Sequence, residues 1–286
     1  MPLVTMKEIV AEADRAGYGV GSFNVVSMQT IMGAIKAAED TQSPIILQAA
    51  EVRLKHSPLH LLGPMMITAA QKARVPVAVH LDHGSKLETI KEALSIGFTS
   101  VMYDGSHLPI EQNIKNTLAV MQLAKDYGAS TEGEIGRVGG SEDSSKDIEM
   151  VITQVKDARS FYQQTGVDAL AVAIGNVHGI YKNEPKLQFQ RLEEIKKTVG
   201  IPLVLHGGSG LTCSDFRKCI QYGIKKINVQ TATLTNVVKR VRSLLDFNKN
   251  VDYFTFHQCV IDATYESVRS HIEAFQSDNR IEAGVD

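Results

Sequence analysis

The chain has 286 residues, of which 43% are hydrophobic and 22% charged, so it can form a core of ordinary size and should not be largely disordered. A formal net charge of −2 offers no bulk attraction for nucleic acid or an anionic membrane surface. The 3 cysteines are too few for a disulfide scaffold, and neither a basic leader nor an apolar run of about 18 residues is present, so we expect a cytoplasmic protein without a membrane or nucleic-acid partner.

Short apolar runs alternate with amphipathic segments along the chain. The runs at 44–49, 168–175 and 202–206 are apolar at successive residues, which is typical of parallel strands covered by helices on both faces. Eight such strand–helix units predict a (β/α)8 TIM barrel, with a doubly wound open sheet as the alternative. The expected strands are 18–25, 44–49, 76–82, 99–104, 129–135, 168–175, 202–206 and 225–231. The expected helices are 28–40, 58–73, 86–96, 109–127, 148–165, 188–199 and 213–222.

No low-complexity stretch or flexible linker divides the chain, so residues 1–286 are expected to form a single barrel domain. The segment 251–280 remains after the eighth unit and has the spacing of a helix. We expect it to form a C-terminal helical extension, either over the barrel or as an oligomer contact.

Three histidines lie where expected strands end. His83 follows the third strand, His178 the sixth and His206 the seventh. Because the carboxyl ends of parallel strands in a barrel meet at one mouth, these side chains are expected to converge. Three imidazoles with an open fourth position are typical of catalytic zinc.

Acidic residues end the third, fourth and fifth strands. Regular alternation directs Asp82 away from its neighbour His83, which favours proton transfer over metal binding for Asp82. Asp104 and Glu134 either hold a second metal position, orient the histidines or are solvated charges at the rim. His80 is expected to hydrogen-bond to a metal ligand or to Asp82.

Two loops have the composition of phosphate sites. A glycine-rich loop at 207–210 precedes an expected helix, and a polar segment at 228–233 follows the last strand. Glycines permit close backbone approach, and barrels often hold phosphate in these two loops. The polar segment 139–145 is expected to be a mobile loop over the substrate, with Glu142 as a candidate base.

Together these segments resemble the class II, zinc-dependent fructose-bisphosphate and tagatose-bisphosphate aldolase family. The resemblance spans about residues 5–275, and DGSHLP and LAVAIGNVHG are closer to the tagatose branch. The matching segments are FNV at 23–25, HLDHG at 80–84, VMYDGSHLP at 101–109, EGEIGRVGG at 132–140, AVAIGNVHGIY at 171–181, PLVLHGGSGL at 202–211 and KINVQT at 226–231.

The resemblance implies reversible aldol cleavage of tagatose-1,6- or fructose-1,6-bisphosphate to dihydroxyacetone phosphate and glyceraldehyde 3-phosphate. Another ketose 1-phosphate is the alternative substrate. Zinc on the three histidines would stabilise the charge left when the C3–C4 bond breaks. Asp82 would take the C4 hydroxyl proton, Glu142 would protonate the carbon, and Asn228 would stabilise the developing charge. A homodimer or homotetramer is also implied.

Further site residues are implied by their position in the matching segments. Asp104 and Glu134 match acids of an alternative metal position. Oxygens of Val177, Gly179, Gly207 and Ser209 would hold a monovalent cation, Na⁺ or K⁺. The substrate-binding residues would be Asn24, Gly179, Gly207, Gly208, Ser209, Asn228, Val229, Gln230 and Thr231.

Departures from the family pattern concern the distal half of the substrate. Gly84 stands where members often carry His or Cys, and the segment 48–50 lacks a hydroxyl that fructose-type members have there. The family's C-terminal arginine for the distal phosphate has Arg269 near its position, without a secure register.

Three other functions compete with this interpretation. A Schiff-base aldolase needs a lysine near a strand's carboxyl end, whereas Lys225 and Lys226 stand at the start of the eighth strand. A metal-dependent hydrolase on this barrel usually has a His-x-His pair on the first strand, which offers Asn24 instead. A non-catalytic sugar-phosphate-binding subunit is disfavoured by the intact Asp82 and histidines.

Overall fold

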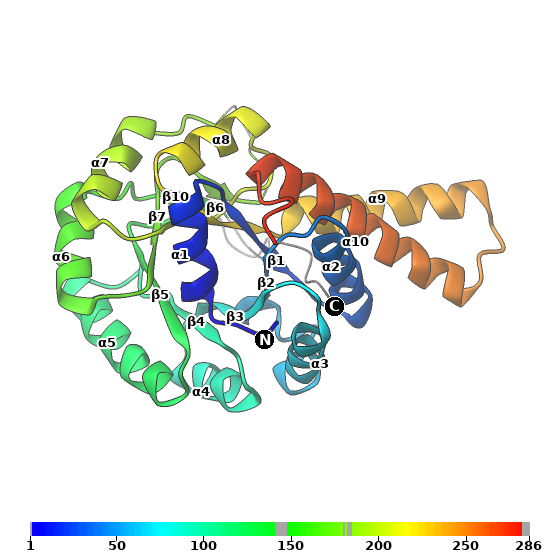
Figure 1. The fold of residues 1–286 in the computed structure, drawn as a ribbon, viewed down its shortest axis with the longest axis horizontal. Helices are drawn as coiled ribbons and strands as arrows, with labels where there is room; N and C mark the ends of the chain where they lie inside the picture. The colour runs from blue at the N-terminus through cyan, green and yellow to red at the C-terminus, as the bar shows by residue number, and fades with distance from the viewer. Residues whose placement is uncertain (1, 141–147, 180, 182–184, 282–286) are drawn as a thin grey trace.

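The computed structural model describes residues 2–140, 148–179, 181 and 185–281. Among these residues, parallel strands form a closed barrel in the order β1-β10-β9-β7-β5-β4-β3-β2, which confirms the predicted (β/α)8 fold and excludes the open sheet (Figure 1). The barrel strands are β1 (Val20–Asn24), β2 (Ile45–Ala50), β3 (Val77–Gly84), β4 (Ser100–Tyr103), β5 (Ser130–Ile135), β7 (Ala169–Val172), β9 (Leu203–Leu205) and β10 (Ile224–Val229).

Helices surround the strands, and six of them, α2, α3, α4, α5, α7 and α8, begin and end within one residue of their expected bounds. They are α2 (Met28–Asp40), η1 (Glu51–Arg53), α3 (Leu59–Lys72), α4 (Leu87–Ile96), α5 (Ile110–Asp126), α6 (Val155–Thr165), α7 (Phe189–Val199), α8 (Cys213–Gln221), α9 (Thr231–Phe247) and α10 (Tyr253–Phe275). The helix expected over 148–165 begins only at Val155, because Ile148 and Val151 form β-bridges with Gly140 and Arg137. The expectations did not include η1 or α9.

The amino-terminal end of the barrel is closed by α1 (Met6–Ala16) (Figure 1). A capping box between Thr5 and Glu8 begins this helix, and Gly17 ends it in the left-handed region. Its apolar side chains and those at the amino ends of several strands form one buried cluster: Met6, Ile9, Val10, Ala13, Val20, Ile46, Ala78, Ala169 and Val204. The carboxyl ends of the strands therefore remain for the polar residues.

Helices α9 and α10 form a hairpin that projects from the barrel, and α10 also packs along α2 (Figure 1). The extension predicted over 251–280 is thus α10. Phe247 and Phe254 at the turn of the hairpin are 95% and 80% exposed. Across the described parts of the chain, no helix is long and apolar enough to cross a bilayer.

Candidate active site

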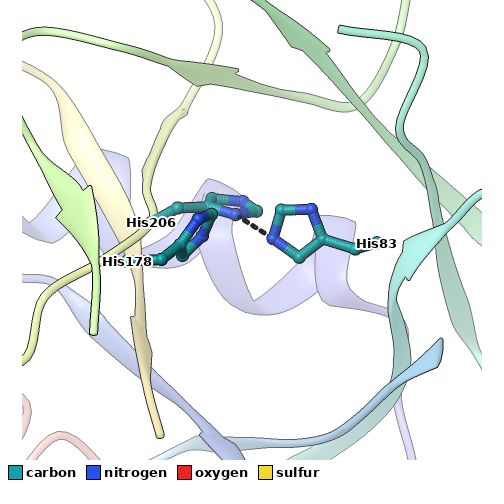
Figure 2. A group of neighbouring side chains, drawn as sticks. All are labelled: His83, His178 and His206. Atoms are coloured by element: carbon teal, nitrogen blue, oxygen red, sulfur yellow. Dashed lines mark hydrogen bonds between the residues drawn. The ribbon is translucent and has the colours of Figure 1, made fainter. Parts of the chain in front are cut away.

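Three histidine rings meet at the carboxyl end of the barrel, as expected from their positions in the sequence (Figure 2). His83 lies on β3, His178 on β8 (Val177–His178) and His206 directly after β9. One nitrogen from each ring lies within 4.8 Å of the other two. His83 Nε2 and His206 Nδ1 are 2.6 Å apart. A set of three convergent imidazole nitrogens is a donor set that fits zinc.

Asp82 faces the same mouth as His83, so the prediction that the two side chains diverge is wrong. His83 has a φ of +48°, and the pairing of β3 with β4 shifts register between Leu81 and Gly84. Such an irregularity turns a side chain that regular alternation would direct outward. Asp82 Oδ1 consequently lies 4.0 Å from His83 Nε2. The residue after His83 must be glycine, because a Cβ on Gly84 would lie 2.6 Å from the carbonyl oxygen of Met102.

Two carboxylates hold the rings of His83 and His206. His83 Nδ1 lies 2.8 Å from Asp104 Oδ2, and His206 Nε2 lies 2.8 Å from Glu132 Oε1. Each contact occupies one ring nitrogen and leaves the other directed at the shared centre. The sequence interpretation allowed such an orienting role for Asp104 but assigned none to Glu132.

Burial and the neighbouring His83 together set the charges of Asp104 and His206. Burial by itself raises the pKa of Asp104, but the hydrogen bond and charge of His83 outweigh it, so the pKa lies well below its ordinary value. Burial, followed by the nearby His83, lowers the pKa of His206 well below that of free imidazole. His206 is therefore neutral near pH 7 and retains a lone pair.

Glu134 lies at the edge of the same cluster. Its Oε2 is 3.9 Å from His83 Nδ1 and 4.0 Å from His206 Nδ1. Ligand atoms of His83, Asp104 and Glu134 also lie within 4.8 Å of one another, so these residues form a second group with the spacing of a metal site.

The carboxylate of Asp82 accepts three amide hydrogen bonds. Asn228 Nδ2 donates to Oδ1 at 2.9 Å, while Gln48 Nε2 and Asn24 Nδ2 donate to Oδ2 at 3.0 and 3.3 Å. The donors come from β10, β2 and β1, so the barrel fixes the carboxylate from three directions. The sequence interpretation had noted Gln48 only as part of a departure from the family pattern.

His80 contacts neither a histidine of the cluster nor Asp82, contrary to expectation. Its Nδ1 lies 2.7 Å from Ser100 Oγ, and its Nε2 lies 3.5 Å from Glu132 Oε2. Burial, reinforced by the charge of Lys226, lowers the pKa of His80 well below its ordinary value. His80 therefore lies next to the carboxylate that holds His206, without a hydrogen bond to it.

A pocket of about 30 Å³ opens beside His178 and Asp82. Two of the expected substrate-binding residues, Gly208 and Val229, do not line it. The Val229 side chain is fully buried in the apolar core between the strands and the surrounding helices, and the Gly208 N–H donates to the carbonyl of Asn228. The lining residues are Asn24, Asp82, His178, Gly179, Gly207, Ser209, Asn228, Gln230 and Thr231.

The helix terminus suited to an anion belongs to α9 and not to α8. A capping box between Thr212 and Asp215 already occupies the amino terminus of α8 with a carboxylate. The residue before α9, Gln230, makes no capping hydrogen bond and lines the pocket with Thr231. Ser209 Oγ accepts from the N–H of Ala232 in the first turn of α9. The two expected phosphate loops thus meet at one helix terminus.

The backbone of Val177 approaches Gly207 of the pocket wall closely. Gly207 has a φ of +64°, and a Cβ there would lie 2.1 Å from the Val177 carbonyl oxygen. The Gly207 carbonyl accepts a hydrogen bond from Tyr181 Oη at 3.0 Å, and burial raises the pKa of Tyr181 to about 12. Glycine is therefore needed where two residues of the expected monovalent-cation site approach each other.

Glu142 lies outside the described residues. Next to it in sequence, β6 (Gly139–Gly140) pairs with β8, so Gly140 is opposite His178. Gly140 and Ile148 also exchange two backbone hydrogen bonds of 2.8 and 3.0 Å. The residues flanking 141–147 are therefore held together beside the histidines.

An arginine other than Arg269 contacts a residue of the pocket wall. Arg269 pairs with Glu273 on the exposed surface of α10. Arg53, at the end of η1, donates from Nε and Nη2 to the side-chain oxygen of Gln230 at 3.1 and 3.2 Å once the Gln230 amide is oriented to accept. A contact across the mouth of this kind leaves no signal in sequence spacing.

Known proteins resemble the chain over almost its whole length. A family model described as fructose-bisphosphate aldolase class-II matches residues 4–280. A fructose-bisphosphate aldolase of Staphylococcus epidermidis is 39% identical over 284 residues, which are 98% of this chain and 99% of that protein. A probable fructose-bisphosphate aldolase of Bacillus subtilis is 42% identical over 248 residues, 86% of this chain and 87% of that protein. The crystal structure of the YdjI aldolase from Escherichia coli K12 is similar with a TM-score of 0.87 and 32% identity, covering 98% of this chain and 100% of that chain.

Proposed function

The chain belongs to the class II fructose-bisphosphate aldolase family of carbon–carbon lyases, and from this premise we propose that it reversibly cleaves a ketose bisphosphate to dihydroxyacetone phosphate and glyceraldehyde 3-phosphate. The names of its relatives favour fructose 1,6-bisphosphate, whereas the sequence segments DGSHLP and LAVAIGNVHG favour the tagatose isomer. The two substrates differ only in configuration at C4. Another ketose 1-phosphate is the alternative.

The metal proposed for the site is zinc, with His83, His178 and His206 as its ligands. The observation that carries the proposal is the convergence of these three rings beside the oriented carboxylate of Asp82. When bound, zinc supplies Lewis-acid polarisation of the ketose carbonyl. Asp104 and Glu134 are the alternative metal position, although the contact of Asp104 with His83 Nδ1 favours an orienting role.

Asp82 is proposed to remove the proton from the C4 hydroxyl as the C3–C4 bond breaks. Its carboxylate can turn little, because Asn24, Gln48 and Asn228 hold both oxygens. Asn228 lines the pocket and also serves as a donor for the charge that develops on the substrate. In this scheme Glu142 delivers the proton to the carbon of the departing dihydroxyacetone phosphate.

The phosphate of the dihydroxyacetone half is proposed to bind at the amino terminus of α9. Gln230 and Thr231 begin this helix, and Ser209, Gly207 and Gly179 complete the wall of the pocket. The helix dipole and free backbone N–H groups favour an anion there. Backbone oxygens of Val177, Gly179 and Gly207 with Ser209 are the proposed site of Na⁺ or K⁺ beside that phosphate.

We also propose a homo-oligomer, a dimer or tetramer of single-domain chains, with the α9–α10 hairpin as a contact. The hairpin carries an apolar hollow of about 420 Å³ near Val238, Leu245 and Phe256, and Phe247 and Phe254 protrude near it. A second copy of the hairpin offers both protruding rings and a matching hollow. A cytoplasmic location remains a prediction from the cysteine content.

A coupled assay for dihydroxyacetone phosphate tests the function. Fructose, tagatose and other ketose mono- and bisphosphates are supplied to protein depleted of metal and to protein reloaded with zinc. We expect product only after reloading, and the highest kcat/KM for a 1,6-bisphosphate. Full activity after thorough metal removal would contradict the proposal and favour Schiff-base chemistry.

A further inference from the structure

A buried ion pair lies directly below the three histidines, inside the barrel. Lys226 on β10 and Glu132 on β5 are fully buried, and Lys226 Nζ lies 2.9 Å from Glu132 Oε2. Two strands, β9 and β7, separate β10 from β5, so this contact crosses the barrel interior. We propose that Lys226 is a positioning residue that sets both His206 and Asp82 for the reaction; the inference rests on the proposed function and deepens it.

The first connection leads from Lys226 to the metal-binding face of His206. Lys226 pairs with one oxygen of Glu132, and the other oxygen lies 2.8 Å from His206 Nε2. An ionised carboxylate only accepts hydrogen bonds, so Nε2 must carry the hydrogen. The lone pair of His206 therefore lies on Nδ1, the nitrogen that faces His83. Lys226 holds the Glu132 carboxylate, which determines which nitrogen of His206 carries the hydrogen.

The second connection leads from Lys226 to Asp82. Lys226 Nζ donates to Asn228 Oδ1 at 2.7 Å, and Asn228 Nδ2 donates to Asp82 Oδ1 at 2.9 Å. An ammonium group can donate but cannot accept, so it selects the orientation in which the amide oxygen faces Lys226. The amide nitrogen must then face Asp82. One cation thus determines the direction of two hydrogen bonds on opposite sides of the mouth.

Lys226 acts through these neighbours and does not contact substrate. It lies below the pocket and is absent from its lining, so its amine is not placed to attack a carbonyl as a Schiff-base lysine would. A fully buried charge pair costs several kcal/mol of desolvation and often contributes nothing net to stability. Stability therefore does not explain why the pair is present, whereas the orientation of His206 and Asn228 does.

The adjacent lysine provides a matched control. Lys225 is also buried, but its Nζ donates to the carbonyl of Ile220 at 3.1 Å and lies 3.9 Å from Asp14. Its partners belong to α8 and α1 and not to the histidine cluster, and the pairing of β10 with β9 shifts register at this point of the strand. The substitutions Lys225→Met and Lys226→Met remove the same ammonium group from adjacent positions of one strand.

The experiment loads both variants with Co²⁺ and records the visible absorption spectrum, the Co²⁺ affinity, kcat and KM. For Lys226→Met we expect an altered spectrum, a 10- to 100-fold weaker metal affinity, and a kcat reduced by about 100-fold or more. KM should change little, because the phosphate terminus of α9 is untouched. Lys225→Met should match the wild type in spectrum, affinity and kcat.

A wild-type spectrum and kcat in Lys226→Met would overturn the inference, and so would equal losses in both lysine variants. Because Lys226→Met leaves Glu132 unpaired and can fail to fold, Glu132→Gln and the double variant are measured as well. The double variant removes both members of the ion pair, so neither charge is left buried without its partner. Its loss in kcat should be far smaller than the product of the two single losses, and simple multiplication of those losses also contradicts the inference.

The spectral readout separates this inference from the proposed reaction. A wild-type protein that binds Co²⁺ with a Lys226-dependent spectrum but releases no dihydroxyacetone phosphate would contradict the proposed function while supporting the connection to His206. Turnover by the wild type with no effect of Lys226→Met would contradict the inference alone.

Discussion

The two ends of the barrel interior differ in what they contribute. At the amino end, α1 and the first residues of the strands form an apolar cluster around Met6, Ile9 and Val10. Toward the carboxyl ends of the strands, the interior holds Lys226 on β10, Glu132 on β5 and Asp82 on β3. On β3, Ala78 belongs to the cluster, while His80 and Asp82 belong to the charged part. The amino end stabilises the fold, and the carboxyl end uses part of that stability to hold polar groups for chemistry.

The largest effect is expected at the centre of the charged end. Asp82→Ala removes the proposed proton acceptor and should reduce kcat by about 100- to 10,000-fold. Steady-state turnover and zinc content measure this, and the zinc content should be unchanged, because the three histidines remain. Normal turnover in this variant would contradict the role of Asp82.

A smaller effect is expected one contact away from the metal. Asp104→Asn keeps the size of the side chain but weakens its hold on His83 Nδ1, so zinc affinity should fall by about 10- to 100-fold. Competition with a chromogenic chelator measures this. Activity at saturating zinc should largely recover, and if it does not, Asp104 has a role beyond orienting His83.

A substitution at the apolar end should lower stability and leave kcat unchanged. Met6→Ala opens a cavity between α1 and the strands and should lower the free energy of unfolding by about 2–5 kcal/mol. Denaturant unfolding measures the loss. The kcat at a temperature where the variant is folded should equal that of the wild type, and a marked drop would show that the two ends are not separable.

The smallest effect concerns pH. His80 has a folded-state pKa below its ordinary value of 6.5, so the unfolded chain binds protons more readily below that pH. Its contribution to stability is complete above pH 6.5 and is lost as the pH falls toward the folded-state pKa. In metal-free protein, His80→Asn should flatten the decline between pH 6 and 5 by roughly 1 kcal/mol per pH unit. An unchanged decline would contradict a buried neutral His80.

The strands and the three histidines were predictable because each depends on local sequence. Buried parallel strands appear as apolar runs, and polar residues at their ends appear directly after them. The direction of His83 was not predictable, because its positive φ falls where the pairing of β3 with β4 shifts register, and regular alternation does not include such a shift.

Contacts that cross the interior of the closed barrel could not be predicted from the sequence either. The pairing of Glu132 with Lys226 depends on how the strands are staggered around the barrel, and sequence spacing does not contain the stagger. Helix α9 escaped prediction for a different reason. Of its residues only Thr233 is buried, and its apolar side chains face the hairpin and solvent, so it is not one of the helices that cover the barrel and that the strand–helix alternation predicts.

The most direct test of the account is a crystal structure of the zinc-loaded protein with anomalous data collected at the zinc edge. We expect one strong peak about 2.0–2.1 Å from His83 Nε2, His206 Nδ1 and a ring nitrogen of His178. A peak bound instead by His83, Asp104 and Glu134, or no peak within reach of the three rings, would contradict the proposed zinc site and the mechanism that depends on it.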